Sequence, residues 1–219
     1  MPPDARGPAA LADILPVSRE TGERLAQYVA LVEKWQKAEN LIAGSTLREI
    51  WRRHVADSAQ LVPLFPTAAR WLDLGSGGGF PGMVVAILVA DRPGATVHMV
   101  ESNSRKCAFL RTAARETGAP AIVRQGRIED VLSEWSAPVD VITARALAPL
   151  GDLLGMAGPL IGPSRPAAFL KGADFRREVA EAAQSFDLDL VEHPSRVADD
   201  SVILEVRRAT PRPGAKPRP

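Results

Sequence analysis

The glycine-rich stretch from Trp71 to Gly82 constrains the fold of this chain more than any other segment. An apolar run, 71–74, leads into a cluster of glycines, and a second apolar run, 83–89, follows directly. This order predicts a buried strand, a tight turn and a helix, because glycine allows positive φ and lets a ligand approach the backbone. The first turn of such a helix presents free N–H groups to a polar ligand. A purely structural glycine loop is the simpler interpretation, but the strand, turn and helix signals all agree with a binding turn.

Two kinds of ligand fit the spacing of these glycines. The register Gly77-x-Gly79-x-x-Gly82 matches a dinucleotide-binding fingerprint, which is a weak signal by itself. The other register begins at Asp73 and continues through Gly75, Gly77 and Gly79. This pattern resembles the first motif of class I S-adenosylmethionine-dependent methyltransferases. A carboxylate at the end of the strand suits a ligand that carries an ammonium and a sulfonium, and it suits a pyrophosphate poorly.

Short apolar runs alternate with helical stretches after this turn, which predicts a doubly wound α/β fold with a mostly parallel sheet. The expected strands are 71–74, 96–101, 121–124, 139–143, 167–170, 188–192 and 202–206. The expected helices are 81–90, 104–117, 128–132, 150–157 and 175–185. The segment between the last two strands is too short for a crossover helix, so we expect an antiparallel C-terminal hairpin. Such a hairpin is typical of the class I (Rossmann-like) methyltransferase sheet, whereas a dinucleotide-binding sheet is expected to be parallel throughout.

The residues before the sheet predict a helical extension. We expect Ser18 to cap a first helix and Thr46 to cap a second helix that ends near Pro63 or Pro66. The expected division is a disordered or irregular N-terminus (1–17), a helical extension (18–66), a methyltransferase domain (67–208) and a disordered, proline-rich basic tail (209–219).

Composition excludes several classes of protein. The 219 residues are 46% hydrophobic, which is enough for one core with a small appendage, and the formal net charge of +1 provides no global basic field. A single cysteine excludes a disulfide framework, and three isolated histidines show no zinc-ligand spacing. The N-terminus lacks the apolar core of a signal peptide, and no stretch is long enough for a membrane helix. We therefore expect a cytoplasmic protein with no metal and no membrane partner.

Polar residues at the carboxyl ends of the expected strands are candidates for the ligand site. Glu101 ends the second strand, where a carboxylate can accept hydrogen bonds from both ribose hydroxyls. The loop with Ile128 and Glu129 follows the third strand, where the methyltransferase fold places a loop against the adenine, with a capped surface helix as the alternative. Arg145 follows the fourth strand and suits a polar base or a phosphate, with a structural ion pair as the alternative. Lys171 follows the fifth strand and can add a second cation, with a surface lysine as the alternative.

A cationic strip is expected on the second helix of the extension. Arg48 and Arg52 lie four residues apart, and Arg53 and His54 follow. A solvated helix face is the simplest interpretation of such a strip. With Lys106 and its basic neighbours on a later helix, the strip could also contact RNA phosphates.

Several segments together resemble one family, the bacterial 16S rRNA guanine-N7 methyltransferases known as RsmG or GidB. The segments are Lys34-Trp35-x-Lys37-Ala38-x-Asn40-Leu41, Arg53-His54-x-x-Asp57-Ser58, Leu72 to Gly82, Gly126-Arg127-Ile128-Glu129, Ala144-Arg145-Ala146 and Leu170-Lys171-Gly172. The chain departs from the family at Phe80, Glu101 and Thr143, where Leu, Asp and Ser are frequent, and none of these changes removes a needed group. The resemblance implies contacts with S-adenosylmethionine at the following residues: Gly75, Phe80, Ile128, Glu129 and Arg145.

The resemblance also implies a reaction, which is methyl transfer to N7 of one guanine in 16S rRNA, the guanine at position 527. The substrate form is open between naked rRNA, an assembly intermediate and the small subunit. N7 has a lone pair and carries no proton, so the reaction requires alignment rather than a general base. N7 lies in the deep groove of an RNA helix, so the guanine must be unpaired. A methyltransferase acting on a protein or small molecule, an NAD-dependent oxidoreductase and a non-catalytic ribosome-binding protein are the alternatives.

Overall fold

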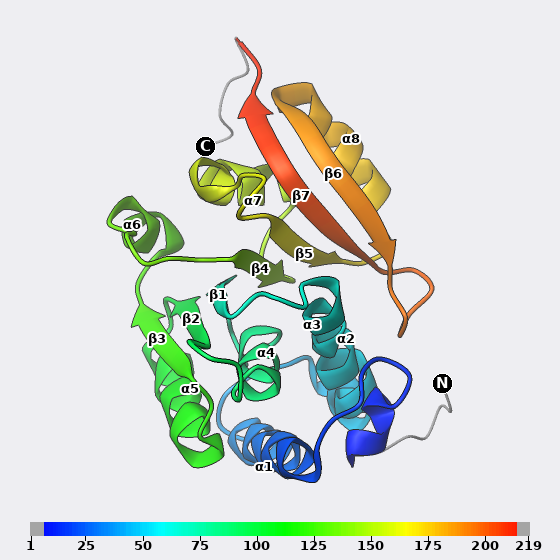
Figure 1. Ribbon diagram of the computed structural model, residues 1–219, viewed down its shortest axis with the longest axis vertical. Coiled ribbons are helices and arrows are strands. Elements are labelled where there is room, and N and C mark those ends of the chain that lie inside the picture. The colour runs from blue at the N-terminus through cyan, green and yellow to red at the C-terminus, as the bar shows by residue number, and fades with distance from the viewer. Residues whose placement is uncertain (1–6, 214–219) are drawn as a thin grey trace.

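The computed structural model describes residues 7–213. A seven-stranded sheet lies between two layers of helices (Figure 1), in the order β3-β2-β1-β4-β5-β7-β6. The strands are β1 (Arg70–Leu74), β2 (Thr96–Glu101), β3 (Ala121–Gln125), β4 (Val141–Arg145), β5 (Ala167–Lys171), β6 (Phe186–Pro194) and β7 (Val202–Pro211). The first five strands are parallel, and β7 pairs antiparallel with both β5 and β6. The expected parallel sheet with a C-terminal hairpin is confirmed.

Strand β4 begins at Val141, later than the expected start at residue 139. The carboxylate of Asp140 accepts hydrogen bonds from the backbone N–H groups of Ala69 and Arg70, at 3.0 and 2.9 Å. The Asp140 side chain therefore joins the beginnings of β1 and β4, and the regular ladder starts one residue after it.

The helices divide between the two faces of the sheet (Figure 1). One face carries α1 (Arg19–Trp35), α4 (Gly82–Leu88) and α5 (Ser104–Thr117), and the other carries α6 (Ile128–Ser133), α7 (Leu150–Ala157) with the 3₁₀-helix η4 (Gly158–Leu160), and α8 (Phe175–Ser185). The predicted Ser18 cap of α1 is confirmed, because its hydroxyl oxygen accepts from the N–H of Thr21 at 3.1 Å. Helix α5 begins after the Asn103 cap and ends at Gly118, which has φ 66°.

The second helix of the extension is not one regular α-helix, which corrects the prediction. It consists of the 3₁₀-helix η2 (Gly44–Glu49), the π-helical turn η3 (Trp51–Ala56), α2 (Asp57–Ala59) and α3 (Leu61–Leu64). Thr46 does not cap it, because the Thr46 hydroxyl donates to the carbonyl of Ala43 at 2.8 Å. The pitch changes along this segment, so side chains four residues apart do not share a face as they would on a regular helix.

The extension and the sheet share one hydrophobic core. A single cluster joins buried residues of α1, such as Leu25 and Val32, to residues of β1, α4 and α5. The short 3₁₀-helix η1 (Gly7–Leu11) packs onto the same cluster through the fully buried Leu11. Residues 7–11 are therefore ordered, which corrects the expectation of disorder and leaves that of an irregular segment, and residues 1–6 lie outside the described part.

The C-terminal boundary also differs from the prediction. Strand β7 continues to Pro211, because Ala209 and Thr210 pair with Leu188 and Asp187 of β6. The expected disordered tail is thus wrong for residues 209–211, and residues 214–219 lie outside the described part. None of the helices between residues 7 and 213 is both long and apolar enough to cross a membrane.

Candidate active site

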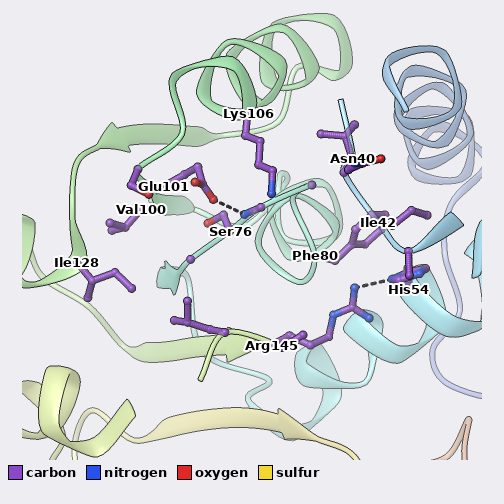
Figure 2. Close-up of a pocket in the computed structure, with 18 of the residues that line it drawn as sticks. Asn40, Ile42, His54, Ser76, Phe80, Val100, Glu101, Lys106, Ile128 and Arg145 are labelled. Carbon is purple, nitrogen blue, oxygen red and sulfur yellow. Dashed lines mark hydrogen bonds between the residues drawn. The ribbon is translucent and has the colours of Figure 1, made fainter. Parts of the chain in front are cut away.

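A cavity of about 790 Å³ lies at the carboxyl edge of β1, β2 and β4 (Figure 2). This volume is in the range of small-molecule sites. Most of the predicted cofactor residues line the cavity, namely Gly75, Gly77, Phe80, Glu101, Ile128, Glu129 and Arg145. The fold therefore brings together residues that follow or end four strands, β1 to β4, and that lie far apart in the sequence, as expected for a parallel sheet.

The glycine turn is packed closely between two other segments. A Cβ on Gly75 would lie 2.5 Å from the Leu147 side chain, and a Cβ on Gly78 would lie 2.7 Å from the carbonyl oxygen of Leu41. Gly75 also has φ +63°, a conformation that other residues rarely adopt. Glycine is required here because the backbone itself forms the cavity wall between the loop after β4 and the segment around Leu41.

Asp73 and Gly79 do not line the cavity, which corrects their prediction as contact residues. Asp73 is fully buried beneath the turn, where Oδ1 accepts from the Thr143 hydroxyl at 2.8 Å and Oδ2 accepts from the Gly82 N–H at 3.3 Å. Burial raises the pKa of Asp73 to about 6. A Cβ on Gly79 would lie 2.6 Å from the Tyr28 hydroxyl. Both residues contact the glycine turn on the side that faces the protein core, away from the cavity.

Glu101 faces the cavity from the end of β2 (Figure 2). Its Oε2 accepts from the Gly77 N–H and its Oε1 accepts from the Asn103 N–H, both at 2.8 Å. Each carboxylate oxygen has acceptor capacity for a second donor. Glu101 can therefore hold the glycine turn in place and still accept hydrogen bonds from two ligand hydroxyls.

Arg145 lies in a chain of hydrogen bonds at the opposite wall (Figure 2). Its Nη2 is 2.5 Å from Nδ1 of His54, and Nε2 of His54 is 2.7 Å from the Thr46 hydroxyl. Arginine can only donate, so Nδ1 of His54 is the acceptor and the ring proton sits on Nε2. Burial, followed by the charges of Arg145 and Arg53, lowers the pKa of His54 to about 3. His54 is therefore neutral at physiological pH.

The guanidinium of Arg145 has two further acceptors and one aromatic neighbour. Nη1 donates to the Arg53 carbonyl at 3.0 Å and lies 3.4 Å from Oδ2 of Asp57. The guanidinium carbon lies 5.4 Å from the centre of the Phe80 ring, which matches a cation–π contact. Burial lowers the pKa of Arg145, and the Asp57 charge opposes that shift. Arg145 is thus fixed at the cavity wall instead of being a mobile surface cation.

The residues predicted to contact RNA form no continuous strip. Arg48 and Arg53 are exposed, but Arg53 lies 3.8 Å from Glu49, so the strip is partly neutralised. Arg52 is half-buried, and its Nε is buried without a hydrogen-bond partner. His54 is buried and neutral, so the prediction that it adds a cation is corrected.

Lys171 is not a free cation either. Its ammonium donates to the Ala148 carbonyl and to Oε2 of Glu178, both at 2.6 Å. Its side chain is only 8% exposed, because α8 places Glu178 against the end of β5. Lys171 therefore joins α8 to the loop after β4.

One wall of the cavity, residues 40–44, was not predicted from the sequence. The Gln36 side chain holds this segment: its Nε2 donates to the Ile42 carbonyl at 2.9 Å, and its Oε1 accepts from the N–H groups of Leu41 and Ile42 at 3.0 and 3.1 Å. Asn40-Leu41 belongs to a segment that carried the family resemblance, and this resemblance is the sequence signal that could have identified the wall. Among the described residues no group of His, Cys, Asp and Glu side chains is arranged to hold a metal ion.

The fold places the chain in a class of proteins, the class I methyltransferase fold. A putative O-methyltransferase from Klebsiella pneumoniae matches with a TM-score of 0.59 and 13% identity, covering 91% of this chain and 94% of that protein. An O-methyltransferase from Bacillus cereus, solved with S-adenosylhomocysteine, matches with a TM-score of 0.54 and 14% identity, covering 90% and 95%.

Sequence comparison then defines the family. The model of the family described as rRNA small subunit methyltransferase G matches residues 21–200. Proteins named ribosomal RNA small subunit methyltransferase G are similar to this chain: one from Parvibaculum lavamentivorans is 52% identical over 192 residues, covering 87% of this chain and 84% of that protein. Another from Bradyrhizobium sp. BTAi1 is 50% identical over 198 residues, covering 90% and 89%. This chain belongs to the rRNA small subunit methyltransferase G (GidB) family, which confirms the resemblance found in the sequence.

Proposed function

We propose that this chain transfers a methyl group from S-adenosylmethionine to N7 of a guanine in 16S rRNA, in the cytoplasm where small subunits assemble. The observation that carries the proposal is the glycine-walled cavity closed by Glu101 and Arg145, in a chain of this family. Family membership argues against the oxidoreductase alternative. The hairpin strand β7 does so independently, because it makes the sheet mixed.

The cavity fits S-adenosylmethionine in size and in chemistry. Glu101 would accept hydrogen bonds from the ribose hydroxyls, and the backbone at Ile128 and Glu129 would face the adenine. Gly75 and Gly77 have no side chain between the backbone and the ligand, and they would surround the amino-acid end together with Phe80. When bound, the cofactor supplies a methyl group activated by its sulfonium.

The residues around the cavity serve alignment and water exclusion. The acceptor nitrogen uses its in-plane lone pair to form the N–C bond as the S–C bond breaks, so no proton has to be removed. None of the described side chains in the cavity is required as a general base, which is consistent with a neutral His54 that is fully engaged with Arg145 and Thr46. Holding the two reactants in line can contribute roughly 7–11 kcal/mol.

The decisive experiment uses cofactor with a labelled methyl group and 16S rRNA that lacks natural modification, offered both naked and within small subunits. Borohydride–aniline cleavage then cuts at N7-methylguanine. We expect the RNA to become labelled and to be cut at one position, the guanine that corresponds to position 527. The variant Glu101→Ala should leave the RNA unlabelled. Label without a cut would contradict N7 as the acceptor. No label, despite measurable cofactor binding, would favour a protein or small-molecule substrate.

A further inference from the structure

A second cavity of about 460 Å³ adjoins the first at the end of β4. The two share a wall, because Arg145, Ala146 and Leu147 line both. Ala146 has φ 50°, which is uncommon for a residue other than glycine and places the chain between the two spaces. A ligand in the second cavity would therefore contact the same guanidinium as a ligand in the first.

Four charged side chains line the second cavity, and they form two pairs. Lys171 and Glu178 bind each other, and the same Glu178 oxygen also accepts from the Leu150 N–H at 2.7 Å. Asp57 faces Arg145 through one carboxylate oxygen at 3.4 Å, and its other oxygen accepts from the Gln60 amide at 3.1 Å. The Asp57–Arg145 pair is the one at the shared wall, and the Asp57 carboxylate has acceptor capacity left.

This pair presents a donor beside an acceptor. Arginine offers only N–H donors and a carboxylate offers only acceptors. The Watson–Crick edge of guanine has the complementary order, with the O6 acceptor next to the N1–H and N2–H donors. Adenine has the reverse order, because its N6 amino group is a donor and its N1 is an acceptor. Enzymes that act on an extruded base commonly read this edge.

We propose that the second cavity is the binding site for the target base, and that Asp57 is its specificity-determining residue, accepting from N1–H and N2–H of guanine while Arg145 donates to O6. The inference rests on the proposed function, because it concerns the acceptor of that reaction. Reading the Watson–Crick edge leaves N7 free of hydrogen bonds, as a nucleophile requires. The Asp57 side chain is 17% exposed, so it is accessible from the cavity while most of its surface is covered by protein.

The test compares three RNAs that differ only at the target position, prepared by ligation to contain guanine, inosine or xanthine. Inosine lacks the 2-amino group, and xanthine replaces it with a carbonyl. We expect the wild type to methylate the guanine RNA about 10- to 100-fold faster than the inosine RNA, since one good base contact discriminates by about 1–3 kcal/mol. Asp57→Asn should bring that ratio close to one and increase the relative rate with xanthine, because asparagine offers an N–H donor.

The matched control is Asp140→Asn, which also removes the charge of an aspartate paired with an arginine, at the opposite edge of the sheet. It should keep the wild-type ratio. Equal rates of the wild type on guanine and inosine would overturn the inference, and so would an unchanged ratio in Asp57→Asn. A folded, cofactor-binding Asp57→Asn that methylates none of the three RNAs would assign Asp57 to positioning Arg145 instead. Failure of the wild type on the guanine RNA would refute the proposed function itself.

Discussion

At the scale of single residues, a buried carboxylate connects the glycine turn to the neighbouring strand. Asp73 accepts from Thr143 on β4 and from the Gly82 N–H at the start of α4, so three elements meet at one side chain. A Cβ on Gly82 would lie 2.6 Å from Oδ2 of Asp73, so this contact also requires a glycine. Asp73 was predicted to contact the ligand. It instead fixes the backbone of the glycine turn, which lines the ligand cavity.

The substitution Asp73→Ala tests this role. It leaves the Thr143 hydroxyl and the Gly82 N–H without an acceptor, and each unsatisfied buried group costs about 1–3 kcal/mol. We expect cofactor binding to weaken at least tenfold while binding to 16S rRNA is retained. Calorimetric titration with S-adenosylhomocysteine and a filter-binding assay with rRNA measure the two quantities. The exposed Asp91→Ala is the control, and unchanged cofactor affinity in Asp73→Ala would show that the turn holds its shape alone.

His54 gives the chain a dependence on pH. Its pKa is about 3 in the folded protein, against 6.5 for an unperturbed histidine. The unfolded chain therefore takes up a proton that the folded protein does not, and folding free energy is lost as pH falls below 6.5. Asp73 acts in the opposite direction, because its pKa is raised from 3.8 to about 6 and its contribution increases as pH falls through 6.

A comparison of wild type with His54→Asn isolates the histidine. The variant lacks the titrating ring, so the difference in unfolding free energy between the two proteins should shrink by about 2 kcal/mol between pH 7 and pH 5. Urea unfolding at the two pH values measures it. If the two proteins lose stability in parallel, protonation of His54 is not what couples folding to pH.

At the scale of elements, the cavity wall at residues 40–44 is held by one side chain. Gln36 makes three hydrogen bonds to the backbone of Leu41 and Ile42, which carries no helix or strand of its own at those residues. That backbone then packs against Gly78. The position of the cavity wall therefore depends on an amide at the end of α1.

We expect Gln36→Ala to release this wall. Amide hydrogen exchange at Ile42 should become at least tenfold faster, since its N–H loses the Gln36 acceptor. Exchange at Leu41 should increase less, because its N–H also donates to the Glu39 carbonyl at 2.8 Å. Cofactor affinity should fall severalfold. Exchange measured by NMR or mass spectrometry, with Lys37→Ala as the neighbouring exposed control, tests the expectation. Unaltered exchange at both amides would mean that packing on Gly78 is sufficient.

Elements with strong local signals could be predicted from the sequence. Helix α5 has a side-chain cap at Asn103 and a left-handed Gly118, and its bounds match the prediction. The segment 44–64 could not be predicted, because 3₁₀ and π turns interrupt the spacing that a regular helix imposes. In the site, the loops that follow the parallel strands could be predicted, because ligand sites of such sheets lie at the carboxyl ends of the strands. The His54–Arg145 contact joins residues 91 positions apart, and no local pattern specifies such a pair.

At the scale of the whole molecule, the N-terminal helices and the sheet share one hydrophobic cluster. Trp35 and Trp51 belong to the extension, and both pack on the same cluster as Trp71 of β1. The Tyr28 hydroxyl donates to the Gly78 carbonyl at 2.6 Å, so α1 also contacts the glycine turn directly. The site is therefore incomplete without the extension.

We expect unfolding to be a single transition. Denaturation followed by tryptophan fluorescence and by far-UV circular dichroism should give coincident curves, because within residues 7–213 the extension has no core separate from that of the sheet. Removal of residues 1–66 should abolish the cooperative transition, since it uncovers the helix-bearing face of β1 and α4. A truncated chain that unfolds cooperatively would show that the remaining residues fold independently.

The strand order has a consequence for shortened chains. Strand β7 lies between β5 and β6, so β6 has no hydrogen bonds to the rest of the sheet except through β7. During synthesis β6 emerges before β7, which is its pairing strand in the described part of the chain. A stop codon just before Val202 would therefore remove only β7 from the polypeptide, but both β7 and β6 would be lost from the sheet. The truncated product would expose the unpaired edge of β5. Unpaired strand edges of this kind promote aggregation.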